Sequence, residues 1–239
     1  NMISHDLRSP LTSMLGSMTM INYGAYGEVS SELSSEVESV TKNINRLITF
    51  VNDILDYQKL EAGKMELELA DHDLTAIISD SVTLVIELAR AKEVEIKVPQ
   101  GNWRVRCDGQ KIVQTVVNLL SNAIKFSPAQ SAVSISVDEI PGYIQLSVTD
   151  CGPGVPAEFR EKIFEAFEQV PSSAKTKVGT GLGLAIAKMI MDAHGGAIGL
   201  QIEESSAKNN DGTGSTFWLR LPATDLTPRQ SIHEEPLKY

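Results

Sequence analysis

The sequence of 239 residues has little of several features that would each indicate a particular class of protein. Its two cysteines, Cys107 and Cys151, are too few for a disulfide framework and lack the spacing of a metal site. No apolar run approaches the roughly 18 residues needed to span a bilayer. Positive charge is also scarce: the formal net charge is −10, which argues against a general nucleic-acid-binding surface. These absences favour an acidic protein of a reducing compartment.

The overall composition is that of a globular protein, with 42% hydrophobic and 22% charged residues. The chain opens with Asn-Met-Ile-Ser-His and does not begin with the apolar region of a signal peptide. We therefore expect a cytoplasmic fragment of a longer protein, whose sensor or membrane anchor precedes residue 1.

Two helical patterns occupy the first quarter of the chain. Apolar residues recur at spacings of three and four from Ile3 to Ile21, and a glycine-containing segment, 23–27, ends the pattern. A heptad-like stripe then runs from about Ser34 to Gly63. A single hairpin of this kind cannot enclose its apolar stripe. We therefore expect two copies to pair as a four-helix bundle, which makes the protein a homodimer.

The hydrophobic period changes after Gly63. Strand-like alternation is found at 94–98, 133–137, 144–148 and 217–221. Pro141-Gly142 predicts a hairpin turn between the second and third of these strands. Helical patterns fall between the strands at about 74–91, 109–126, 157–167 and 182–194.

The expected fold class is therefore α plus α/β: a dimerising helical hairpin followed by an α/β sandwich of mixed strand order. The predicted domains are 1–66 and 67–224. The remaining residues, 225–239, have no apolar period, and we expect a mobile tail there.

The stretch SHDLRSPL, residues 4–11, combines a titratable pair with a helix-distorting proline. His5 lies roughly 200° round the helix from Ile3 and so points away from the apolar stripe. Pro10 cannot donate a hydrogen bond to the carbonyl of Asp6, so the helix should bend beside the histidine. A neutral imidazole is a good nucleophile toward phosphorus, and an adjacent carboxylate can accept its proton. On this stretch alone, a surface histidine in a proline-containing helix explains the pattern equally well.

The stretch NLLSNAIKFSP, residues 118–128, places Asn118, Asn122 and Lys125 on one face of a predicted helix. Amide oxygens can bind a hard cation such as Mg²⁺, and a lysine can bind phosphate. Capping amides or amides on a helix surface are the commoner explanation of this stretch taken by itself.

Two glycine-rich stretches follow. In DCGPGV, residues 150–155, a carboxylate at a strand end can accept a hydrogen bond from an adenine amino group, and the glycines let backbone approach the ring. GTGLGLAIAKMI, residues 179–190, opens a helix with N–H groups suited to phosphate. It is neither a P-loop nor a dinucleotide fingerprint. A plain turn also explains the first stretch, and the second alone is a weak signal.

Taken together and in this order, these stretches resemble the catalytic core of a bacterial-type sensor histidine kinase, over roughly residues 1 to 222. SHDLRSPL is similar to the H box of that family, NLLSNAIKFSP to its N box and DCGPG to its first glycine box. IFEAFEQV, residues 163–170, is similar to the F box. GTGLGL and GTGSTF, the latter at 212–217, are similar to the later glycine boxes. The resemblance implies a gyrase-like ATP-binding domain that uses ATP and Mg²⁺.

The resemblance also implies a role for each site residue. His5 would accept the phosphoryl group and Asp6 would be its general base. Asn122 would bind Mg²⁺. The residues that would contact the nucleotide are Asn118, Asn122, Lys125, Asp150, Gly152, Gly154, Phe164, Phe167, Lys177, Gly179, Gly181, Gly183, Leu184 and Thr216. The segment between Phe167 and Gly179 would be the ATP lid.

Two positions bear on which activities to expect. Related ATPases such as gyrase carry a glutamate where Asn118 stands, and an asparagine cannot act as a general base toward water. Ser9 stands where related kinases often carry threonine or asparagine to position water, so a phosphatase activity toward the partner is left open. His72, His194 and His233 have no cluster of carboxylate or cysteine residues around them in the sequence and are interpreted as structural or solvated.

The predicted function is ATP-dependent autophosphorylation of His5, followed by transfer to an aspartate of a response regulator receiver domain. Nucleic acid is not expected as a partner. The alternatives are a dimeric scaffold that nucleotide binding switches without catalysis, and a plain ATPase. The intact His5, Asp6, Asn122 and Asp150 argue against the scaffold, and Asn118 and the helical hairpin argue against the ATPase.

Overall fold

The structure is a computed structural model, which describes residues 2–63, 65–170, 180–201 and 214–223, with the backbone alone for 2–8. The predicted tail, 225–239, and most of the predicted lid, 171–179, lie outside the described residues. The chain divides into two compact units: residues 1–66 with 155–189, and residues 67–154 with 190–239. The predicted domain boundaries remain a prediction.

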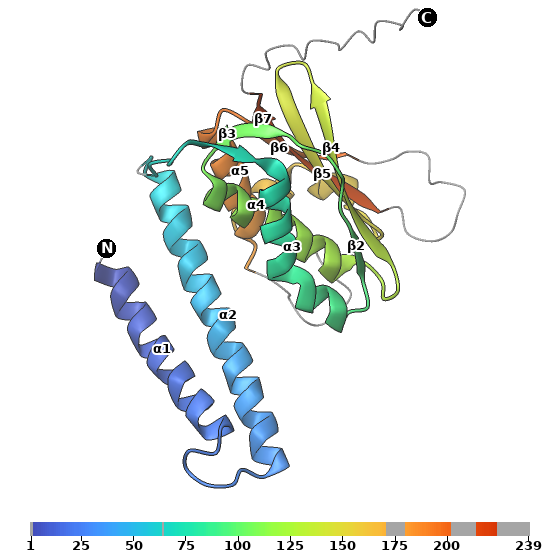
Figure 1. Ribbon diagram of the computed structural model, residues 1–239. Helices are drawn as coiled ribbons and strands as arrows, with labels where there is room; N and C mark the ends of the chain where they lie inside the picture. The colour runs from blue at the N-terminus through green and yellow to red at the C-terminus, as the bar shows by residue number, and fades with distance from the viewer. Residues whose placement is uncertain (1, 64, 171–179, 202–213, 224–239) are drawn as a thin grey trace, which may run out of the picture. The chain divides into compact units, whose positions relative to one another are not determined.

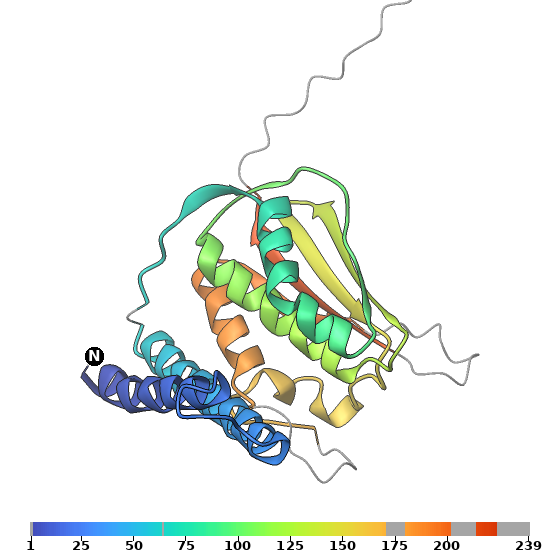
Figure 2. The same cartoon turned by 60° about the horizontal axis from the view of Figure 1, so that its bottom comes forward.

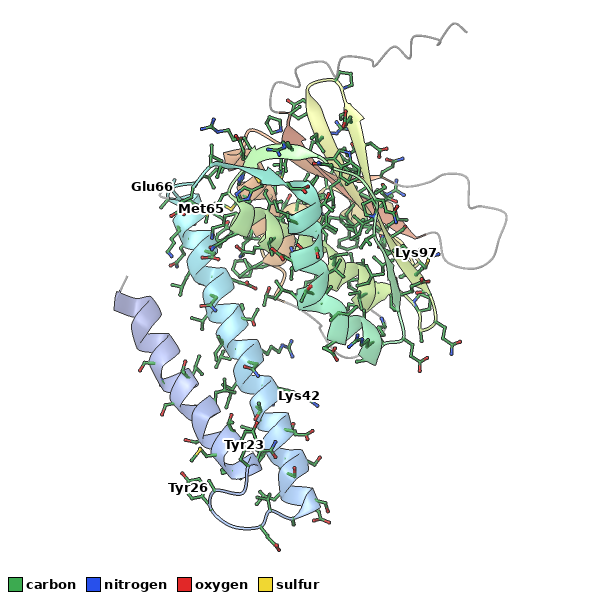
Figure 3. The ribbon with its side chains drawn as sticks, in the orientation of Figure 1. Tyr23, Tyr26, Lys42, Met65, Glu66 and Lys97 are labelled. Carbon is green, nitrogen blue, oxygen red and sulfur yellow. The ribbon has the colours of Figure 1, made fainter. Side chains whose placement is uncertain are left out.

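The helical hairpin of the first unit consists of α1 (Met2–Asn22) and α2 (Ser31–Glu61), as the periodicity predicted (Figure 1). The turn between them carries the exposed rings of Tyr23 and Tyr26 (Figure 3). The helix α2 begins three residues before the predicted Ser34, because the Ser30 hydroxyl accepts a hydrogen bond from the Leu33 N–H and caps the helix. The hydroxyl of Ser34 also donates to the Asn22 side chain at 3.1 Å, which ties the two helices together at the turn.

The apolar stripe of α2 is only partly covered within one chain. Val37 and Ile44, seven residues apart, are buried, whereas Val40 and Leu47 of the same stripe are 41% and 46% exposed. Seven residues are two turns, so each pair forms a row along the helix. The second row is left for another surface to cover.

Two short 3₁₀ turns replace the single helix that was predicted over 157–167. They are η1 (Ala157–Phe159) and η2 (Lys162–Phe164). The second ends because Glu165 is extended, and Phe167 then adopts a left-handed φ of 67°. The prediction was wrong because helical spacing of apolar residues in a short segment does not distinguish an α-helix from successive turns. The helix α5 (Gly183–Ala193) follows, close to its predicted range.

A five-stranded sheet forms the centre of the second unit, in the order β2-β4-β5-β7-β6. These strands are β2 (Glu95–Lys97), β4 (Ala132–Ile140), β5 (Tyr143–Asp150), β6 (Ala197–Gln201) and β7 (Ser215–Pro222). The predicted mixed order is confirmed, because β2 pairs with β4 in parallel and the other pairs are antiparallel. Pro141 and Gly142 form the predicted turn between β4 and β5, and Gly142 has a φ of 80°.

Three strands were not predicted: β6 and a separate pair, β1 (Ala70–Asp73) with β3 (Arg104–Cys107). The pair is short, and β1 lacks the apolar alternation that marks a strand. The cysteine that ends β3, Cys107, is buried, and burial raises its pKa to about 11. Cys107 and Cys151 are both free.

Two helices, α3 (Leu74–Ala91) and α4 (Gly109–Phe126), cover one face of this sheet (Figure 2). The core between them is made of fully buried side chains, among them Ile112, Leu119, Leu120 and Ile124 of α4, Leu146 of β5, and Leu219 of β7. Each such side chain contributes about 1.5–3 kcal/mol relative to exposure. This packing fixes the rotation of α4 and therefore the direction of its polar residues. Within the described residues no helix is both long and apolar enough to cross a membrane.

Candidate functional site

The candidate phospho-acceptor lies on α1. His5 and Asp6 fall within this helix, as predicted, and their side chains are outside the described residues. Ser9, one turn after His5, is exposed, and Pro10 lies inside the helix immediately after it. The first unit therefore carries an exposed hydroxyl one helical turn from the histidine.

The helix α4 presents three candidate nucleotide-binding residues. It begins where the carboxylate of its N-cap, Asp108, accepts a hydrogen bond from the Lys111 N–H at 3.2 Å. Its apolar face is buried against the sheet, and Asn118, Asn122 and Lys125 are half-buried beside that face.

The amide of Asn118 is unusual. Its nitrogen, Nδ2, is buried and is the one such side-chain atom without a hydrogen-bond partner in the part of the chain that the structure describes. A buried donor without an acceptor costs about 1–3 kcal/mol, so a water molecule or a ligand is needed to accept from this nitrogen. An oxygen-rich ligand such as a phosphate group would satisfy it.

Asp150 lies at the end of β5 and is 6% exposed. Its Oδ1 accepts hydrogen bonds from the N–H groups of Gly152, at 2.7 Å, and Ser215, at 3.2 Å. Burial raises the pKa of Asp150, and these two backbone hydrogen bonds oppose that rise. Both bonds are made by Oδ1, so Oδ2 is the oxygen suited to accept a hydrogen bond from an adenine amino group.

The glycines of this loop allow close approach of backbone. A Cβ at Gly152 would lie 2.8 Å from Asp150 Oδ1 and 3.1 Å from the carbonyl oxygen of Phe126, so any side chain would displace the carboxylate or the end of α4. Gly154 has a φ of 76°, which favours glycine. The N–H of Gly214 donates to the Gly152 carbonyl at 3.0 Å. The structure thus brings the end of α4, the loop 150–154 and the start of β7 together.

The β7 residue that contacts Asp150 is Ser215. Thr216, the residue that was predicted, points to the opposite face of the sheet, where its hydroxyl lies 2.9 Å from that of Thr149. The signal for Ser215 was present in the sequence. Phe217, which faces the core, is two residues away, so strand alternation places Ser215 on the core face as well.

The first unit holds the other described candidates. Phe164 and Leu184 are half-buried and Gly183 begins α5, while Lys177 and Gly179 lie outside the described residues. The N–H of Phe167 donates to the Gly181 carbonyl at 2.9 Å. Gly181 has a φ of 74°, and a Cβ there would lie 2.9 Å from the Phe167 backbone. The F box and the second glycine box are therefore joined backbone to backbone.

Thr180 connects this segment to α2 within the same unit. Its hydroxyl donates to Asp53 Oδ2 at 3.2 Å and accepts from the Leu182 N–H at 3.2 Å. Four residues along α2, the ring of Tyr57 lies 6.4 Å from that of Phe167, centre to centre. Burial raises the pKa of Asp53, and the hydrogen bond from Thr180 opposes the rise.

The described residues contain no group of three His, Cys, Asp or Glu side chains that could hold a metal ion. Mg²⁺ keeps several waters and binds through one or two protein oxygens together with substrate phosphates, so a site for it needs few protein ligands. The half-buried Asn122 amide can supply one such oxygen, and the unpaired Asn118 amide lies one turn before it.

Comparison with known proteins gives a consistent result. Residues 1–63 match the family described as "His Kinase A (phospho-acceptor) domain". Residues 107–225 match the family described as "Histidine kinase-, DNA gyrase B-, and HSP90-like ATPase". The circadian input-output histidine kinase CikA of Synechococcus elongatus is 33% identical over 98% of this chain and 31% of its own length. The chain thus spans about a third of that curated relative.

Three of the solved structures that are similar to this chain illustrate the likeness. Full-length ShkA in complex with AMPPNP has a TM-score of 0.74 and 31% identity, over 95% of this chain and 46% of ShkA. The mycobacterial sensor histidine kinase MprB has a TM-score of 0.58 and 33% identity, over 66% of this chain and 100% of that structure. The histidine kinase ThkA in complex with the response regulator protein TrrA has a TM-score of 0.62 and 25% identity, over 92% of this chain and 61% of that one.

Proposed function

The chain belongs to the histidine kinases that combine a phospho-acceptor domain with a gyrase-like ATPase domain, and on this basis we propose that it phosphorylates its own His5 from Mg·ATP. We propose further that the phosphoryl group then passes to an aspartate of a response regulator. The observation that carries the proposal is the buried, unpaired amide of Asn118. It can donate to a phosphate oxygen but cannot deprotonate water, so the site holds ATP without hydrolysing it.

We assign adenine recognition to Asp150, whose Oδ2 accepts from the amino group of the base, with Gly152 allowing the loop to lie close to Asp150 Oδ1 and the Phe126 carbonyl. Asn118 and Lys125 are assigned to the phosphates, and Asn122 to Mg²⁺. The resemblance assigns Lys177, Gly179, Gly181 and Gly183 to the triphosphate as well. AMPPNP, an ATP analogue, is bound in the complex of the related kinase ShkA, which supports the choice of nucleotide.

In the proposed reaction, an imidazole nitrogen of His5 attacks the γ-phosphorus, and a new N–P bond forms as the bond to the bridging oxygen of ADP breaks. Asp6 takes the imidazole proton, and ADP carries away the electron pair of the broken bond. Bound Mg²⁺ supplies neutralisation of the negative charge on the phosphates. The contribution of the protein is to position the groups and to exclude a water-activating base.

A receiver domain and a second copy of the chain are the proposed partners. ThkA is a histidine kinase of similar fold in complex with a response regulator, which supports the first partner. The exposed Val40 and Leu47 on α2 support the second, because a partner hairpin would cover them. In the second step, phosphohistidine gives its phosphoryl group to a carboxylate oxygen of the receiver aspartate.

The test is incubation with γ-labelled ATP and Mg²⁺, followed by measurement of label on the protein. We expect label that is acid-labile and base-stable, and its loss in His5→Gln with nucleotide affinity unchanged. Release of free phosphate without labelled protein would support a plain ATPase. Nucleotide binding with neither product would support the scaffold that nucleotide binding switches.

A further inference from the structure

The end of α4 leaves backbone carbonyls that need donors. The last carbonyls of a helix have no partner within the helix. Here the cap residue Ser127 is extended and Pro128 follows, so neither the left-handed glycine cap nor a proline N–H is available. The Ser127 N–H donates to the carbonyl oxygen of Ala123, which satisfies only that one carbonyl of the last turn.

A lysine from another helix satisfies two of these carbonyls. Lys92, the residue that caps the C-terminus of α3, donates from Nζ to the carbonyl oxygen of Ile124 at 2.9 Å and also to that of Lys125. Its ammonium group meets the negative end of the α4 dipole, which favours a cation there. Lys92 is half-buried, and desolvation lowers its pKa. Partial removal of this ammonium group from water therefore costs free energy, which the two hydrogen bonds and the helix dipole offset.

The backbone just after these carbonyls supports the loop that carries Asp150. The buried hydroxyl of Ser127 accepts a hydrogen bond from the Cys151 N–H at 3.3 Å. Gly152 packs against the Phe126 carbonyl and donates its own N–H to Asp150 Oδ1. A change in the direction in which the chain leaves α4 would therefore move the carboxylate.

We propose that Lys92 is a positioning residue for base recognition, acting through the end of α4 and Ser127 on the adenine-binding Asp150. The inference rests on the proposed function, because it concerns the nucleotide that the kinase accepts. Lys92 does not touch the base. It fixes the support against which Asp150 is held, so its loss should weaken discrimination between adenine and other bases more than it weakens phosphate binding.

The experiment measures dissociation constants of Mg·ATP and Mg·GTP for the full chain by titration calorimetry. GTP presents an oxygen where ATP presents the amino group, so the ratio of the two constants reports the placement of the Asp150 carboxylate. In Lys92→Met the preference for ATP over GTP should fall about tenfold, as expected for one misplaced hydrogen bond. Lys92→Arg, which keeps the charge and several donors, should restore most of the preference.

Two further variants separate positioning from general destabilisation. Ser127→Ala removes the intermediate link, so it should lower the same ratio, and the double variant should lose less than the product of the two single effects. Lys97→Met, at an exposed lysine of β2, is the matched control and should leave the ratio unchanged (Figure 3).

The outcomes separate this inference from the proposed function. If the wild-type chain binds ATP no better than GTP, that result would contradict the proposed nucleotide site itself. A wild-type chain that prefers ATP, with Lys92→Met and Ser127→Ala showing the same preference, would overturn the positioning role alone. Equal loss of ATP and GTP affinity in Lys92→Met would also overturn it, because that result indicates loss of fold rather than loss of base recognition.

Discussion

Replacement of Asp150 by asparagine should separate nucleotide affinity from stability. The amide keeps Oδ1, which can still accept from Gly152 and Ser215, and puts an NH₂ group in place of Oδ2. That group faces the adenine amino group, donor against donor. A hydrogen bond to a charged acceptor contributes about 1.5–3 kcal/mol, so the dissociation constant for Mg·ATP should rise about 10- to 150-fold.

The same substitution, which lowers nucleotide affinity, should not lower the stability of the fold at neutral pH. Burial raises the pKa of Asp150 above its ordinary value of 3.8, so the ionised carboxylate is disfavoured in the folded state. A carboxyl with a raised pKa stabilises the fold below its unfolded-state pKa, and that contribution is lost as pH rises through the folded-state pKa. At neutral pH the asparagine variant, which has no charge to bury, should be as stable as wild type or more so, and this advantage should shrink toward pH 4.

The assay pairs calorimetric titration with thermal unfolding at several pH values. A purine riboside triphosphate, which lacks the 6-amino group, should bind wild type about as weakly as the variant binds ATP. Asp138→Asn, at an exposed carboxylate of β4, is the matched control and should leave the affinity for Mg·ATP unchanged. The assignment of Asp150 fails if its asparagine variant binds ATP within twofold of wild type, or if wild type binds the purine analogue as tightly as ATP.

Other perturbations have distinct expected outcomes. Asn122→Ala should abolish the Mg²⁺ dependence of ATP binding, measured by titration with and without EDTA, because it removes an oxygen ligand; an unchanged dependence would exclude this ligand. The full chain should sediment as a dimer, and lysine at both Val40 and Leu47 should dissociate it by placing charges in the interface; a monomeric wild type would contradict the bundle. Asp6→Asn should slow autophosphorylation by about 100-fold or more for a lost proton acceptor. Ser9→Ala should spare autophosphorylation and affect only removal of phosphate from the regulator; equal loss of labelling in both variants would show that their roles are not separate.

The sequence predicted the helices well because each has a sustained period and a recognisable end. The α2 stripe and the Asp108 cap of α4 are local signals. The region 157–167 was misjudged because its backbone is set by distant partners: Phe167 turns left-handed where it bonds to Gly181, fourteen positions later in the chain. Short strands such as β1 have too few residues to show a period.

The candidate site residues show the same difference between local and distant signals. Asn118, Asn122 and Asp150 could be picked out because each stands in a motif beside an apolar element. The prediction that named Thr216 did not use the alternation of β7, which the sequence does contain. Lys92 gives no local signal at all, because its partners lie 32 and 33 residues away and are main-chain atoms.

The order of strands in the sheet has a consequence for synthesis of the protein. β5 lies between β4 and β7, and its partner β4 is joined to it by a two-residue turn, so this hairpin can form as soon as both strands leave the ribosome. The other partner, β7, pairs Ser215 with Asp150 across 65 residues. Until β7 emerges, β5 has a free, apolar edge and the Asp150 carboxylate lacks one of its two backbone donors. A nascent chain that ends before β7 should therefore be unable to hold ATP and should be a preferred substrate for chaperones.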